Sequence, residues 1–157
     1  MTLAAELQRL ARWNGWANAI VAAAIHDAGG EPLPALRAYQ HIFETEVTWL
    51  RRVDGVENAF TGLWGDASLA RAEAWHEEAV QRLRNLSANL DEEALAATFT
   101  YANSTGRQFT DRVDQTLLQL LFHSQQYRGE CAAAMIAAGQ PVKDFDYIIW
   151  RRLGEPE

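Results

Sequence analysis

The chain has 157 residues, of which 48% are hydrophobic and 22% charged, values that are ordinary for one soluble globular domain. Lys and Arg number 14 against 21 Asp and Glu, and the resulting net charge of −7 would repel the phosphates of a nucleic acid. The single cysteine, Cys131, excludes an internal disulfide and fits a reducing compartment. There is no signal-peptide pattern, and no apolar run reaches the roughly 20 residues that a bilayer requires. We therefore expect one cytoplasmic domain over residues 1–157 that binds neither nucleic acid nor a membrane.

Apolar side chains recur at three- and four-residue steps in four long segments, which is the spacing of amphipathic helices. Capping residues precede these segments, and glycines and prolines follow them. Helices are therefore expected over approximately the ranges 3–28, 34–53, 69–89 and 114–138. Because most of the connections are short, the sequence predicts an all-α fold, a four-helix bundle.

Three segments outside these helices have patterns of their own. Residues 98–111 alternate aromatic side chains with threonines and then turn, a short hairpin-like signal before the last long helix. The connection at 56–65 carries Phe60 and Trp64, which we expect to anchor it to the bundle. The aromatic-rich tail, 142–157, is expected to pack back on the bundle or on a second subunit. Together with six tryptophans in the chain, this tail favours a homodimer.

Of the four histidines, His123 has the most suggestive surroundings. Positions four apart on a helix lie about 40° apart around its axis, so His123 and Tyr127 share a face. Thr116, Leu120 and Glu130 extend that strip in both directions. Two interpretations stay open: the strip forms one wall of a site, or it is a semi-polar seam in which Tyr127 donates to a carbonyl.

His41 lies in the second helix on a comparable strip, together with Ala38, Thr45 and Thr48. Small and neutral polar groups around one histidine are unusual for a packed interface and favour a cavity. The alternative is a partly solvated flank without a role.

The remaining candidate groups are interpreted as structural. His76 closes the only Glu-x-x-His motif, whereas di-iron bundles use two such motifs with further carboxylates. His26 lies near the end of the first helix, where an imidazolium suits the helix dipole. Cys131 is expected to act as a small apolar side chain, as buried cysteines usually do.

These residues together resemble the DinB/YfiT-like family of metal-dependent enzymes, which are four-helix bundles. That family places one histidine early in the second helix and two, four residues apart, in the last helix, followed by Arg-Gly-Gln or a close variant. Here QHIFETEVTWLRR is similar to the second-helix motif and LLQLLFHSQQYRGE to the last-helix motif. His41 and His123 match two of the histidines, and Arg128-Gly129 match the signature. LARWNGWANAIV and AAGQPVKDFDYIIWRR resemble the family's opening helix and its ending, so the resemblance covers essentially the whole chain.

The resemblance implies a metal site made of His41, His123 and Tyr127, although Tyr127 stands where the family has its third histidine. Three histidines would hold a divalent metal with one open position, and imidazole suits zinc or nickel. A tyrosine hydroxyl, with a reference pKa of about 10, must lose its proton to ligate well, which would favour a harder metal such as ferric iron. Otherwise the site has two histidines and low affinity, unless Glu44 or Glu130 supplies a carboxylate.

Two functions are compatible with this resemblance. The first is a metal-dependent transferase or hydrolase that acts on a small-molecule substrate with a low-molecular-weight thiol, since family members with assigned activities include transferases that move groups onto thiols such as bacillithiol, mycothiol or glutathione. The second is a non-catalytic bundle with a degenerate metal site, acting as a binding or dimeric interaction protein. The replacement at Tyr127 favours the second.

Overall fold

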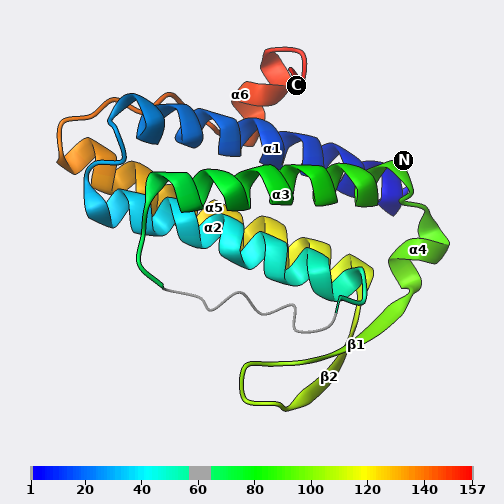
Figure 1. Cartoon of the computed structure of the whole chain (residues 1–157). Coiled ribbons are helices and arrows are strands. Elements are labelled where there is room, and N and C mark those ends of the chain that lie inside the picture. Colours follow the sequence, from blue (N-terminus) through cyan, green and yellow to red (C-terminus); the bar gives the residue numbers. More distant parts are fainter. Residues whose placement is uncertain (1, 57–64, 157) are drawn as a thin grey trace.

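The computed structural model describes residues 2–56 and 65–156 and contains the predicted bundle. Four long helices, α1 (Leu3–Asp27), α2 (Leu33–Val53), α3 (Leu69–Ala88) and α5 (Val113–Ala137), lie alongside one another (Figure 1). The all-α bundle expected from the sequence is confirmed. The predicted anchors Phe60 and Trp64 lie outside the described residues.

Local chemistry fixes where the helices begin and end. The Thr2 and Ser68 side chains accept hydrogen bonds from backbone amides in the first turns of α1 and α3, where these groups have no intrahelical partner. Gly29 and Gly139 follow α1 and α5 with φ angles of 64° and 76°, a backbone region that glycine adopts at little cost. These boundaries agree with the predicted ones to within a few residues.

A short helix and a hairpin separate α3 from α5. Helix α4 (Glu92–Ala96) begins after Asp91, whose side chain accepts from the Ala94 amide at 2.8 Å. Strands β1 (Thr98–Ala102) and β2 (Gln108–Arg112) then pair antiparallel, which confirms the hairpin-like signal. Helix α4 was not predicted, because five residues are too few to show a helical apolar stripe.

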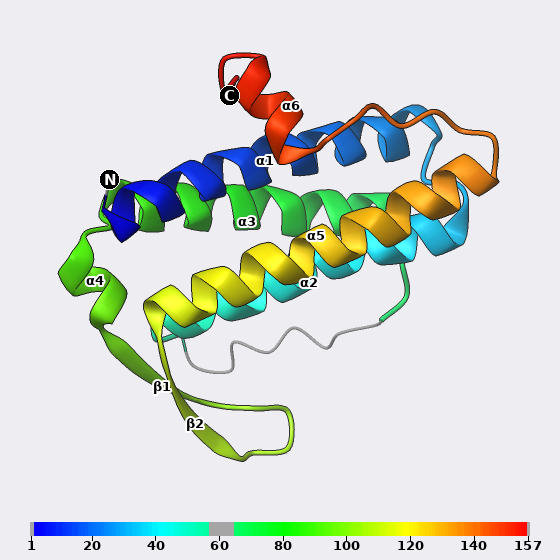
Figure 2. The same cartoon turned by 180° about the vertical axis from the view of Figure 1, so that it is seen from behind.

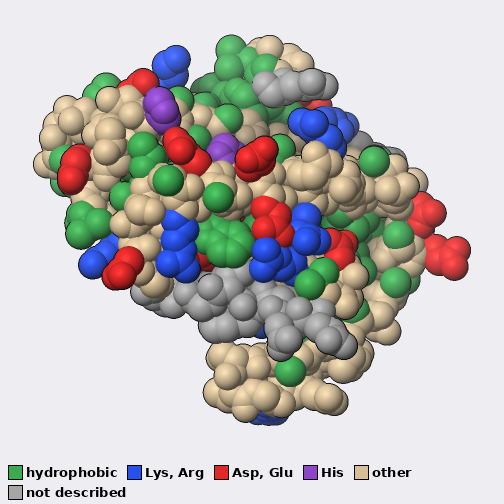
Figure 3. All heavy atoms as spheres, in the orientation of Figure 1, with side chains coloured by type: hydrophobic (Ala, Val, Ile, Leu, Met, Phe, Trp, Pro, Cys, Tyr) green, Lys and Arg blue, Asp and Glu red, His purple; other side chains and the backbone are tan. Residues whose placement is uncertain are grey.

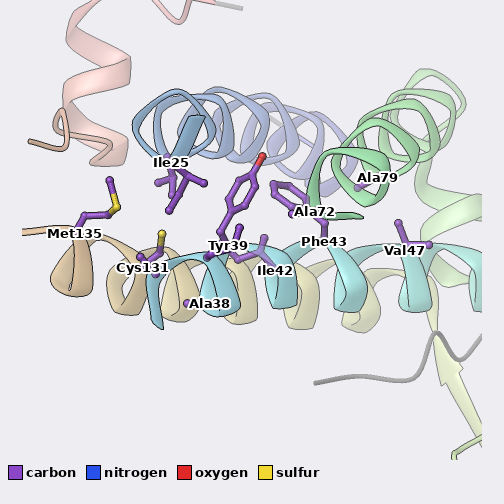
Figure 4. Close-up of a cluster of buried hydrophobic side chains, with 13 residues drawn as sticks. Ile25, Ala38, Tyr39, Ile42, Phe43, Val47, Ala72, Ala79, Cys131 and Met135 are labelled. Atoms are coloured by element: carbon purple, nitrogen blue, oxygen red, sulfur yellow. The ribbon is translucent and has the colours of Figure 1, made fainter. Parts of the chain in front are cut away.

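The core between the long helices is built from two main clusters of buried side chains. One cluster joins all four long helices and includes Tyr39, Phe43 and Met135 (Figure 4). The other lies toward the hairpin and includes Leu7, Leu50 and Leu120. Helix α2 packs most extensively, against α5 on one side and α3 on the other, so residues on its α5-facing surface are well placed to form a site.

The C-terminal tail packs back on α1, one of the two alternatives that its composition predicts. It contains a short helix, α6 (Tyr147–Arg152), which lies against α1 on the side away from α2 (Figures 1 and 2). Trp150 is fully buried against Trp13 and Ala17, and its indole donates to the Pro156 carbonyl at 2.8 Å.

On the surface that carries α3, basic side chains alternate with acidic ones (Figure 3). Arg82, for example, pairs with both Glu78 and Asp54. Among the described helices, none combines the length and apolarity needed to cross a membrane.

Candidate functional site

The structure brings the three residues expected at the metal site together between α2 and α5. The ring centroid of His41, on α2, lies 5.1 Å from that of His123 and 4.4 Å from that of Tyr127, both on α5. The centroids of His123 and Tyr127 are 4.6 Å apart. The four-residue spacing on α5 therefore presents an imidazole and a phenol to the same imidazole of the neighbouring helix.

Burial determines the charge state of the two α5 side chains. Burial, and next the neighbouring His41, lower the pKa of His123 from 6.5 to about 4, so this imidazole is neutral near pH 7. Its Nδ1 atom is buried and makes no hydrogen bond to any described residue. Burial and the charge of Glu130 raise the pKa of Tyr127, so the phenol keeps its proton near neutral pH. A neutral imidazole is the form that binds a metal ion, whereas a protonated phenol binds one poorly.

Glu44 is a buried carboxylate beside His41. Its side chain is 1% exposed, and its Oε2 atom lies 3.9 Å from Nδ1 of His41, which is longer than a hydrogen bond. The Gln40 amide donates to Glu44 Oε1 at 2.9 Å. By contrast, Glu130 is exposed and accepts a hydrogen bond from Gln126 at 3.3 Å. Of the two carboxylates considered from the sequence, only Glu44 therefore lies beside an imidazole of the site.

A polar cavity of about 280 Å³ adjoins Glu44. It is lined by Arg37, Gln40, Glu44, Gly65, Asp66 and Ala67. Glu44 belongs both to the cavity wall and to the surroundings of His41, so this side chain links the cavity to the site. The rings of His41, His123 and Tyr127 do not line the cavity. Its volume lies near the lower limit for small-molecule sites in proteins.

Behind the rings lies a fully buried polar network centred on Arg128. Its Nη1 donates to the side-chain oxygens of Asn14 and Asn18, both at 2.6 Å. The amide groups of these two asparagines donate in turn to Glu46 Oε1, at 2.9 and 3.0 Å, and Ser124 donates to the same oxygen at 2.6 Å. All five residues are at most 2% exposed. A positive and a negative side chain are thus linked through amides inside the bundle, across α1, α2 and α5.

This network fixes the orientation of α5 at the candidate site. Ser124 and Arg128 directly follow His123 and Tyr127, and consecutive helical residues point about 100° apart. When Ser124 and Arg128 are held toward α1 and Glu46, the two preceding residues are turned about 100° away from that direction, toward His41. From the sequence, Arg128 was assigned only to the family's Arg-Gly signature, and its hydrogen-bond partners were not predicted. The signal was present in Asn14 and Asn18, two amides four residues apart within an apolar helix.

The other titratable candidates lie elsewhere. His76 stacks on Phe43, at 4.4 Å between ring centroids, and its Nδ1 lies 3.3 Å from the Tyr39 hydroxyl. His26 is exposed, near Glu73. Cys131 is fully buried in the core, and burial raises its pKa to about 12, so it is an unreactive thiol.

No group of three or more His, Cys, Asp or Glu side chains suited to a metal ion occurs within residues 2–56 and 65–156. Among the described residues, the side chains that converge on the candidate site from α2 and α5 are two imidazoles and a phenol.

The architecture and the histidine-bearing interface between α2 and α5, here called the α2–α5 seam, define a class of protein. It is a four-helix bundle whose second and last long helices present imidazoles to each other. A family model described as the DinB superfamily matches residues 34–131, from the start of α2 into α5. The match covers more than half of the chain, and the protein belongs to the DinB superfamily. The comparisons with curated proteins and with solved structures gave no match.

Proposed function

We propose that the chain is a metal-binding member of the DinB superfamily, in which His41 and His123 hold a divalent cation and Tyr127 completes the site. The observation that supports this proposal is the convergence of three rings from two helices, with no centroid separation above 5.1 Å. The neutral state of His123 and its unpartnered Nδ1 add to the support. Zinc and nickel are the cations that two imidazoles suit best.

Tyr127 differs from a third imidazole in its charge state. Because its pKa is raised, the phenol is protonated near neutral pH and acts as a hydrogen-bond donor toward a substrate beside the two imidazoles. It becomes a ligand only to a strong Lewis acid such as ferric iron, which favours phenolate oxygen.

The reaction that we propose is transfer or hydrolysis on a small-molecule substrate with a low-molecular-weight thiol. A bound divalent cation favours the deprotonated form of such a thiol near neutral pH. The cavity beside Glu44 would take the polar part of the substrate, with Arg37 in its wall as a hydrogen-bond donor.

A non-catalytic binding protein is the second candidate, and one observation favours it. The described residues hold no third His, Cys, Asp or Glu that joins the two imidazoles in a metal-binding group. In this case the seam keeps its shape but binds metal weakly, and the protein acts through binding or as a homodimer. The outer surface of α5 offers apolar contacts for a second copy, since Phe122 and Ile136 are 70% and 63% exposed.

Elemental analysis of protein purified without a histidine tag separates the two candidates. The first predicts about one metal ion per chain in the native protein and its loss in His123→Ala. Under the second, the native protein is metal-free, and Tyr127→His gains metal because it completes a set of three imidazoles. Metal-free native protein would refute the catalytic proposal.

A further inference from the structure

Arg52 stands out among the arginines because two aromatic rings pack against its guanidinium group. Its central carbon lies 4.6 Å from the ring centroid of Trp49, also on α2, and 4.2 Å from that of Tyr101, on β1. The hairpin therefore packs over α2 through this side chain. The two ring centroids are 5.4 Å apart, so the rings approach the guanidinium from neighbouring directions and restrict its orientation. The N–H groups at its edges remain for hydrogen bonds.

Those edges make no hydrogen bond and no ion pair with any residue that the structure describes, although Arg52 is only 9% exposed. Its Nε atom is buried without a partner. The neighbouring Arg51 is the opposite case, because Glu78 accepts from its Nε and Nη2 at 2.7 and 2.6 Å. Asp111 contributes only at longer range, since it accepts the Tyr101 hydroxyl at 2.8 Å and forms no ion pair with Arg52.

A guanidinium without a partner among the described residues is costly in such a place. Burial lowers the pKa of Arg52, which reflects the loss of water around the charge. Buried charges are normally compensated by a partner of opposite sign, and buried polar atoms are normally hydrogen-bonded. A planar guanidinium with a free edge matches a carboxylate or phosphate group, which it can bind through two parallel hydrogen bonds.

Further unpartnered polar atoms lie along the same seam between α2 and α5. The hydroxyl oxygens of Thr45 and Thr116 are buried without hydrogen bonds to described residues, and these residues are 6% and 4% exposed. Arg52 follows His41 by eleven residues on α2, about three turns and about 16 Å, so the two share a face of the helix. The two threonines occupy the stretch of seam between the three rings and Arg52.

We propose that Arg52 is the anchor of an anion-binding site, where its free guanidinium edge binds the carboxylate or phosphate group of a small-molecule ligand lying along the α2–α5 seam. The hydroxyls of Thr45 and Thr116 are available to the uncharged polar groups of that ligand. This site requires no metal and goes beyond the proposed reaction, because it assigns a charged group to the ligand.

The test is an NMR titration of the full-length, metal-free protein with inorganic phosphate and, separately, with glutarate. Sodium chloride at equal ionic strength is the reference. We expect a saturable shift of the Arg52 Nε–Hε signal with at least one of the two anions, and the anion that binds more tightly identifies the group. Binding should weaken at least tenfold in Arg52→Met, whereas the matched control Arg51→Met should bind like the native protein.

Arg52→Lys keeps the positive charge but lacks the two parallel N–H donors of a guanidinium. This variant tests the anion site if Arg52→Met does not fold. It should bind the anion more weakly than the native protein. The proposal is overturned if neither anion gives a saturable shift beyond that of chloride, or if Arg52→Lys binds as tightly as the native protein. Because the titration uses protein from which metal has been removed, such a result leaves the proposed metal site untouched.

Discussion

Replacing Arg128 with methionine tests whether the buried network organises the bundle. Methionine keeps much of the length of the side chain but removes its charge and its donors. The guanidinium is fully buried and makes 2.6 Å hydrogen bonds to Asn14 and Asn18, so its loss leaves two amide oxygens without donors. It also leaves Glu46 as a buried charge without a nearby cation. Breaking a buried charged pair on one side typically costs about 3–5 kcal/mol, and we expect a loss in that range for Arg128→Met.

Urea unfolding followed by circular dichroism measures the loss in the free energy of unfolding. A double-mutant cycle with Glu46 shows whether the loss comes from the interaction between the two charges. Glu46→Gln alone should also destabilise, because it leaves Arg128 without its counter-charge. The double variant removes both charges and should be more stable than the sum of the two single effects predicts, by about 1–3 kcal/mol. A cost below about 1 kcal/mol for Arg128→Met, or strictly additive effects, would refute the reasoning.

Three further predictions concern single side chains. The pKa of His123 is about 4 in the folded protein, against an ordinary value of 6.5. As the pH falls, His123 is therefore protonated in the unfolded chain before it is protonated in the folded protein. Metal-free protein should therefore lose about 2 kcal/mol of stability between pH 6.5 and 4, and urea unfolding of His123→Gln should lack that loss. Cys131, with a pKa of about 12, should react with a thiol reagent at pH 8 at least about 100-fold more slowly in the folded than in the unfolded protein, and equal rates would place it at the surface. If α5 forms a dimer face, Phe122→Glu should shift the native protein from dimer to monomer in analytical ultracentrifugation, whereas a native monomer would exclude that dimer.

The fold could be predicted from the sequence wherever local signals agree with the final packing. The long helices were found because their apolar spacing, their caps and the glycines that end them all point the same way. Helix α4 and helix α6 were missed as helices, since five or six residues show too little periodicity and depend on packing for stability.

Two of the candidate rings could be predicted to share a face from their spacing on one helix. That His41 would meet them rested on the family resemblance, since spacing within one helix carries no information about its neighbour. The charged network escaped prediction for the same reason. Glu46 and Arg128 are far apart in the sequence, and each looks like an ordinary surface residue until the helices are packed.

The central claim is that His41 and His123 form a metal site, and a cobalt titration of the metal-free protein tests it most directly. Co²⁺ reports its ligands through visible absorption. We predict one site per chain, a loss of at least tenfold in affinity for His41→Ala and for His123→Ala, and no change for His26→Ala, whose imidazole is exposed and remote from the seam. Equal affinities in the native protein and the His41→Ala and His123→Ala variants would contradict the account.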